Sequence, residues 1–170
     1  LLLVVMTYNA DGVNWLPSQR QELFYDSSQR LRTRVVTVWR TDRWENLNTF
    51  TYFYDDKDNL IVYHRDYWYN GTWTDFSTDS LFYDHRSFLT ERSVRLTATG
   101  QYYTRMLYHN TFTGLKLSQT RQDYQGLSWV NKAKTRYIYN RCGTLTNTYG
   151  EIWSNGNWEP DSRTDIYYHH

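Results

Sequence analysis

Hydrophobic residues in this chain are concentrated in segments of about ten residues, rich in Val, Thr, Tyr, Trp and Phe, that alternate with short polar clusters. No segment shows a sustained helical period, and no proline falls between Pro17 and Pro160. The pattern predicts an all-β fold, an antiparallel meander of about eleven long strands in an open sheet or repeat array. Strands are expected over most of 31–39, 44–54, 60–68, 73–83, 145–153 and 158–167.

A repeat of 29 residues runs along the chain. Tyr25, Tyr54 and Tyr83 follow one another at steps of 29, and Tyr139 and Tyr168 are again 29 apart. Tyr108-His109 is assigned to the gap between them, with unequal steps of 25 and 31. In three repeats, a first Trp follows the Tyr after 14 residues and a second Trp follows after 5 more, with Thr97 and Tyr102 in these two places in the third repeat. These pairs are Trp39 and Trp44, Trp68 and Trp73, and Trp153 and Trp158.

The period divides the chain into repeat units of one domain, 1–170, in which each unit contacts mainly its neighbours. The predicted divisions are a partial unit 1–24, units 25–53, 54–82, 83–107, 108–138 and 139–167, and the start of another at 168–170.

One end of each unit carries a hairpin signal between the two Trp positions. Asn70-Gly71 and Asn155-Gly156 supply the two φ > 0 residues of a type I′ turn, which places Trp68 opposite Trp73 within reach of offset aromatic stacking. Weaker versions of the turn are Thr41-Asp42, Thr99-Gly100 and Gln125-Gly126.

The other end of each unit carries a Tyr-Asp or Tyr-Asn pair. The Asp or Asn side chain is expected to open a type I turn by an Asx hydrogen bond, and the residue four after the Tyr is expected to be left-handed and followed by a bulge. The left-handed positions are Gln29, Asp58, Ser87 and Gly143.

Two motifs resemble known repeats. Tyr139 to Leu145 reads Tyr-Asn-x-x-Gly-x-Leu, and the same signature without its Gly begins at Tyr25 and Tyr54, which resembles the YD (RHS-type) repeat of bacterial surface and secreted proteins. Trp-x-Asn-Gly-x-Trp resembles a longer hairpin repeat of secreted Bacteroidetes proteins. The resemblance covers nearly the whole chain from about Trp15, and it implies a secreted or cell-surface β-hairpin repeat protein of a bacterium.

Neither face of the predicted strands is purely apolar. His64 and Asp66 share a face with Leu60, and period two places Trp73 and Asp79 on one face of 73–83. A sheet that faces lipid needs a continuous apolar band, and a transmembrane helix needs at least 18 apolar residues, so no membrane span is expected. The longest apolar run, Leu1 to Met6, is predicted to be a strand.

Composition and charge narrow the partners. Aromatic residues make up 19% of the chain against 39% for all hydrophobic residues, and the mean hydropathy is -0.82, which favours half-exposed rings over a dry core. With 19 basic and 18 acidic residues the net charge is +1, so no nucleic-acid partner is expected.

Candidate catalytic and metal-binding groups coincide with repeat positions. Asp55, Asp56 and Asp58 are explained by turn chemistry, and a calcium loop lacks its Gly and distant Glu. Cys142 has no partner His at an informative spacing, and the sequon Asn70-Gly71-Thr72 lies in a tight turn. No enzyme activity, metal or cofactor is therefore expected. The five histidines are interpreted as structural or turn residues, or in the last case as a tag remnant: His64, His85, His109, His169 and His170.

The rows of tryptophan form the one candidate binding site. An aromatic ladder of Trp39, Trp44, Trp68, Trp73, Trp153 and Trp158 would stack on the sugar rings of an extended polysaccharide, or would only staple the hairpin turns. Uncapped strand edges favour continuation of the array in a longer protein or pairing with a second copy. The leading hypothesis is a non-enzymatic extracellular stalk, adhesin or self-associating fibre segment, and the alternative is a carbohydrate-binding module.

Overall fold

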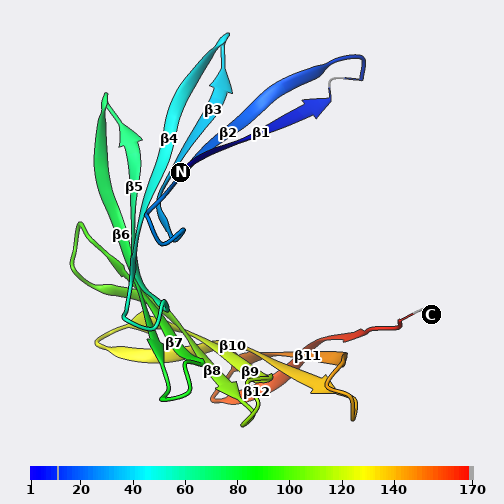
Figure 1. Ribbon diagram of the computed structural model, residues 1–170. Coiled ribbons are helices and arrows are strands. Elements are labelled where there is room, and N and C mark those ends of the chain that lie inside the picture. Colours follow the sequence, from blue (N-terminus) through cyan, green and yellow to red (C-terminus); the bar gives the residue numbers. More distant parts are fainter. Residues whose placement is uncertain (11, 169–170) are drawn as a thin grey trace. The chain divides into compact units, whose positions relative to one another are not determined.

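The computed structural model describes residues 1–10 and 12–168, and these residues form β-strands and turns. Twelve strands follow one another, close to the predicted eleven (Figure 1). Their bounds are β1 Leu2–Ala10, β2 Trp15–Tyr25, β3 Leu31–Arg40, β4 Arg43–Tyr54, β5 Leu60–Tyr69, β6 Thr72–Tyr83, β7 Leu89–Leu96, β8 Tyr102–Asn110, β9 Lys116–Gln125, β10 Ser128–Tyr139, β11 Leu145–Ser154 and β12 Asn157–Asp165.

Each strand is hydrogen-bonded to its neighbours in the chain. The order in the sheet is β1 to β12 without a crossover, and β1 and β12 stand at its two ends. The pairings are antiparallel, as between β3 and β4 or β10 and β11. These findings confirm the predicted open antiparallel meander.

The strands fall into two compact parts, which are described separately. The N-terminal part consists of Leu1–Asp79 with Leu96–Gly100, and the C-terminal part of Ser80–Arg95 with Gln101–His170. The assignment of one repeat domain to 1–170 stays a prediction. His169 and His170, to which the sequence assigned the start of a further unit, lie outside the described residues.

Backbone angles confirm the I′ turns at both Asn-Gly pairs. Asn70 and Gly71 have φ of 48° and 81°, and Asn155 and Gly156 have 49° and 83°. The turn predicted at Gln125-Gly126 lies one residue later, because Gln125 still pairs with Ser128 in the ladder and the positive φ values belong to Gly126 and Leu127.

The turn predicted at Thr99-Gly100 is also different. Of the two residues, only Gly100 has a positive φ, 65°. Its N–H donates to the carbonyl oxygens of Leu96 and Thr97, at 2.9 and 3.3 Å, so the loop between β7 and β8 is wider than a two-residue hairpin.

The opposite turns follow the predicted Asx design. Gln29, Asp58 and Ser87 have φ between 61° and 64° without being glycine, and Gly143 has 78°. In the first of these turns, Asp26 Oδ1 accepts hydrogen bonds from the N–H groups of Ser28 and Arg30, both at 2.9 Å. The local carboxylate thus satisfies two backbone donors that the strand ladder leaves free.

The structure corrects the repeat register in the middle of the chain. Thr111, not His109, opens the Asx-type turn: its N–H donates to Leu115 O at 2.7 Å, and Gly114 takes the left-handed position with φ 88°. His109 lies within β8 and is no turn residue. Asn110 therefore stands at the Tyr position, and the steps become 27 and 29, so the third unit is two residues short.

A hydrogen bond from the repeat Tyr joins neighbouring strands at this end of the sheet. Each hydroxyl donates to a carbonyl 23 residues earlier: Tyr54 to Leu31 O at 2.9 Å, Tyr139 to Lys116 O at 2.9 Å and Tyr168 to Leu145 O at 3.0 Å. At the corrected position the side-chain amide of Asn110 donates to Leu89 O at 2.9 Å and replaces the missing hydroxyl.

Interior packing is thin throughout the described residues. Val36 is the one buried hydrophobic residue, while Ser77, Asp79 and Ser93 are buried polar residues. Side-chain contacts between adjacent strands, together with the backbone ladder, therefore supply most of the stabilisation. The described residues contain no helix with the length and apolar character that crossing a membrane requires.

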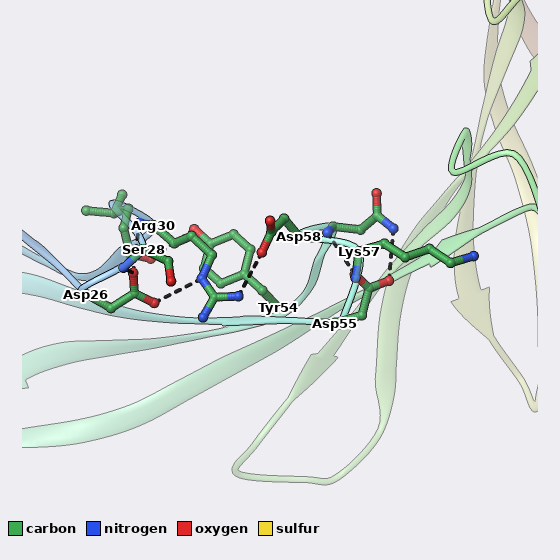
Figure 2. Close-up of polar contacts among 9 residues, drawn as sticks. Asp26, Ser28, Arg30, Tyr54, Asp55, Lys57 and Asp58 are labelled. Carbon is green, nitrogen blue, oxygen red and sulfur yellow. Dashed lines mark hydrogen bonds and ion pairs between the residues drawn. The ribbon is translucent and has the colours of Figure 1, made fainter.

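Arg30 connects two successive Asx turns in the N-terminal part (Figure 2). Its guanidinium donates to Asp26 Oδ2 at 3.0 Å and to Asp58 Oδ1 of the next turn at 2.8 Å, and it lies 5.5 Å from the centre of the Tyr54 ring. The repeat turns are therefore joined to one another by charge as well as by the Tyr hydroxyl.

Acid is expected to weaken these turns selectively. Hydrogen bonds hold the pKa of three turn carboxylates below the ordinary 3.8, so their contribution is complete above about pH 4 and is lost as the pH falls through each lowered pKa. The strongest donors are the N–H of Arg30 for Asp26, the side chain of Asn59 for Asp55 and the N–H of Phe88 for Asp84.

The matched control is the turn opened by Asn140, whose amide does not titrate. Its Oδ1 accepts from the Cys142 N–H at 2.9 Å, as Asp26 accepts from Ser28. In an NMR pH titration the Ser28 N–H is expected to shift with a midpoint below 3.8, whereas the Cys142 N–H stays constant. A midpoint at or above 3.8, or an equal shift at Cys142, would contradict the assignment.

Candidate functional site

The predicted Trp pairs meet across their hairpins. Trp39 stands opposite Trp44 and Trp153 opposite Trp158 in the strand register, and the three ring pairs have centroid distances of 4.9 to 5.1 Å. Their interplanar angles are 69° to 71°, so the rings pack edge to face and not in the offset stack that was expected. This arrangement directs the positive edge of one indole at the negative face of its partner.

A fourth aromatic group occupies the same place in the C-terminal part. Tyr124 packs edge to face on Trp129 at 5.1 Å, and Tyr102 contacts both rings at 6.2 and 5.6 Å. Tyr124 and Trp129 were not among the predicted site residues. Their spacing of five residues, the same as between the paired Trp residues, is the signal that identifies them.

Trp15 lacks such a partner in the register. It pairs with Ala10 across the β1–β2 hairpin and is 74% exposed, in contrast to the half-buried Trp39 and Trp68. The comparison indicates that a second ring, and not the strand surface alone, covers each paired indole.

An open groove of about 400 Å³ separates two successive Trp pairs in the N-terminal part. Trp44 and Trp68 contribute rings, while Arg43, Glu45 and Asn46 contribute polar groups along it. Arg43 and Glu45 also form an ion pair at 2.8 Å. The groove therefore combines apolar ring surface with hydrogen-bonding groups, which are the elements of a sugar subsite.

The remaining candidate groups are engaged in local contacts. His64 Nδ1 lies 2.9 Å from Thr78 Oγ1 and its ring packs on Phe53, whereas His85 and His109 are exposed. Burial, reinforced by the charge of Asp75, raises the pKa of Asp66.

The predicted turn assignment of the acidic cluster is consistent with its contacts. Asp55 Oδ1 accepts from the N–H of Lys57 and of Asn59, and Asp58 pairs with Arg30. Cys142 is an exposed free thiol. Within the described residues no group of three or more His, Cys, Asp or Glu side chains is placed to hold a metal ion.

Comparisons with known proteins give distant structural likenesses. No protein-family model matches the chain, and no curated protein matches it. A protein of unknown function from Bacteroides fragilis is 14% identical over 96% of this chain and 92% of its own, with a TM-score of 0.37. A porin-like protein from Bacteroides uniformis is 10% identical over 95% of this chain and 94% of its own, with a TM-score of 0.39.

A third solved structure, TcdB2-TccC3-TEV, is 13% identical over 95% of this chain but only 12% of its own, with a TM-score of 0.29. TM-scores this low assign no function to the chain.

Proposed function

We propose that this chain is a non-enzymatic structural repeat domain of an extracellular bacterial protein, and that it self-associates through the edge strand β1. The observation that carries the proposal is the exposure of β1: every one of its nine residues is exposed. Leu2, Val4 and Met6 lie on one face of the strand and Leu3 and Val5 on the other. An apolar edge strand with a free row of N–H and C=O groups favours addition of another strand.

The opposite edge has the features that discourage such pairing. β12 carries Glu159, Pro160 and Asp161 in an exposed stretch, and its register against β11 shifts between Gly150 and Glu151. Proline, charge and bulges all blunt a strand edge. The difference between the edges favours an isologous contact, in which β1 of one copy pairs with β1 of another.

Substituting Val5→Lys is expected to abolish this self-association. A lysine at the centre of β1 would place two ammonium groups close together in a symmetric pair and leave apolar partners uncovered. Sedimentation velocity over a concentration series should show a dimer for the unaltered chain and a monomer for the variant, with unchanged far-ultraviolet circular dichroism.

The matched control is Glu159→Lys on β12, which also adds a lysine to an exposed edge strand and should leave the dimer intact. A chain that stays monomeric at every concentration, or a Val5→Lys variant that still dimerises, would contradict the proposal.

Carbohydrate binding along the tryptophan pairs is the second candidate, favoured by the groove between Trp44 and Trp68. Edge-to-face packing works against it, because each pair turns one ring away from the flat surface on which a sugar stacks. The effect of removing the rings separates the two interpretations and is considered in the Discussion.

A further inference from the structure

Arginine and phenylalanine alternate in a row across four strands of the N-terminal part, on the face opposite the Trp pairs. Arg34 on β3 pairs in register with Phe50 on β4, which pairs with Arg65 on β5. Phe76 on β6 continues the row beside Arg65. Arg34 is five positions from Trp39 and Arg65 three from Trp68, so period two directs them to the other face. These four residues are called the cation–aromatic row.

The guanidinium groups of the row lie against rings. The Arg34 guanidinium carbon is 4.1 Å from the centre of the Phe50 ring, and that of Arg65 is 5.9 Å from Phe50 and 5.0 Å from Phe76. Stacking on a ring holds a guanidinium flat and leaves its outer side available to a ligand. The two arginines stand about 10 Å apart, because two strand spacings separate β3 from β5.

The charge of the row has no carboxylate partner among the described residues. The one printed bond of the Arg65 guanidinium is to the neutral amide oxygen of Asn48, at 3.4 to 3.5 Å, and Arg34 Nε is buried with no acceptor. Elsewhere in the chain, arginines have a carboxylate within 4.0 Å, as in the pairs of Arg20, Arg30, Arg43, Arg86, Arg105, Arg121, Arg136 and Arg163.

Two stacked, uncompensated guanidiniums between aromatic rings form a site for an anion attached to a flat apolar unit. We propose that the cation–aromatic row binds an acidic polysaccharide, with uronate carboxylates on Arg34 and Arg65 and a sugar ring over Phe50. Guanidinium binds carboxylate through two parallel hydrogen bonds, and the arginine spacing is close to the length of a disaccharide.

Single-stranded nucleic acid would also combine charge with stacking. The chain favours the polysaccharide because its net charge is only +1, whereas nucleic-acid binding draws on an extended basic surface that neutralises several phosphates. The site lies apart from the β1 edge proposed for self-association, so loss of one activity leaves the other measurable.

Binding of polygalacturonate by isothermal titration calorimetry tests the proposal. The unaltered chain is expected to bind polygalacturonate but not neutral dextran, and more weakly as salt increases. Arg34→Gln and Arg65→Gln should each weaken binding about tenfold, because each removes a charge-assisted hydrogen-bonding group. Arg136→Gln is the matched control: it removes an arginine already paired with Glu151, in the C-terminal part, and should leave binding unchanged.

A direct measurement on the unaltered chain guards against misfolded variants. The side-chain Nε–H NMR signals of Arg34 and Arg65 are expected to shift when oligogalacturonate is added, while that of Arg136 stays in place. Equal binding to dextran, tighter binding to oligothymidylate, retained affinity in a folded double glutamine variant or unshifted Nε–H signals would each overturn the proposal.

Discussion

Replacing Asn70 and Gly71 with two valines is expected to destabilise the β5–β6 hairpin by about 3 kcal/mol, because a β-branched residue is strained in the left-handed region. Both positions require that region, with φ of 48° and 81°. The turn also holds Trp68 against Trp73, whose centroids are 4.9 Å apart, so loss of the turn should separate the rings.

Hydrogen exchange measured by mass spectrometry checks this outcome. Protection is expected to fall over residues 60–83 and to remain over the hairpin that contains Asn155 and Gly156, which is built on the same turn in the C-terminal part. Unchanged protection over 60–83 would show that the turn does not determine the hairpin.

Removing one ring from each of two Trp pairs is expected to lower stability without removing a binding activity. Trp68→Ala and Trp153→Ala should each cost about 2 kcal/mol, since each deletes a half-buried indole and an edge-to-face contact. Urea denaturation followed by circular dichroism measures the loss, and retention on insoluble polysaccharides measures binding.

Trp15→Ala is the matched control for these substitutions. Trp15 is 74% exposed and faces Ala10, so its removal deletes the same side chain without an aromatic partner and should change the unfolding free energy by less than about 0.5 kcal/mol. If Trp68→Ala instead keeps full stability and abolishes retention on a polysaccharide, the rings form a sugar platform and the second candidate function is correct.

Self-association through β1 and polysaccharide binding by the cation–aromatic row would act together in an extracellular layer. Pairing two copies doubles the number of rows, and multivalent contact with a polymer raises the apparent affinity without any new interaction. The arrangement allows weak individual sites, which suits a thin sheet with Val36 as its one buried hydrophobic residue among those described.

Local chemistry explains why strands and turns were predictable from the sequence. Asn-Gly specifies a I′ turn, Tyr-Asp an Asx turn, and both depend on residues only a few positions apart. The spacing of five between Trp68 and Trp73 follows from the same turn, because a two-residue loop leaves little freedom in the register.

Bulges account for the errors in assigning faces. His64 contacts Thr78, and Tyr63 donates to Asp79 at 2.6 Å, so Thr78 and not Asp79 lies on the face of Trp68 and Trp73. One extra residue in a strand reverses every later side chain, and period-two counting along 73–83 has no means of detecting it.

The sequence by itself determined the all-β class, the hairpin turns and the cross-strand Trp pairs, because each rests on neighbours close in the chain. Only the tertiary structure decided the edge-to-face angle of the rings, the place of Asn110 in the repeat and the alignment of Arg34, Phe50 and Arg65. Those features depend on register between strands, where a shift of one residue changes which side chains meet, and that register is set by bulges and packing across the sheet.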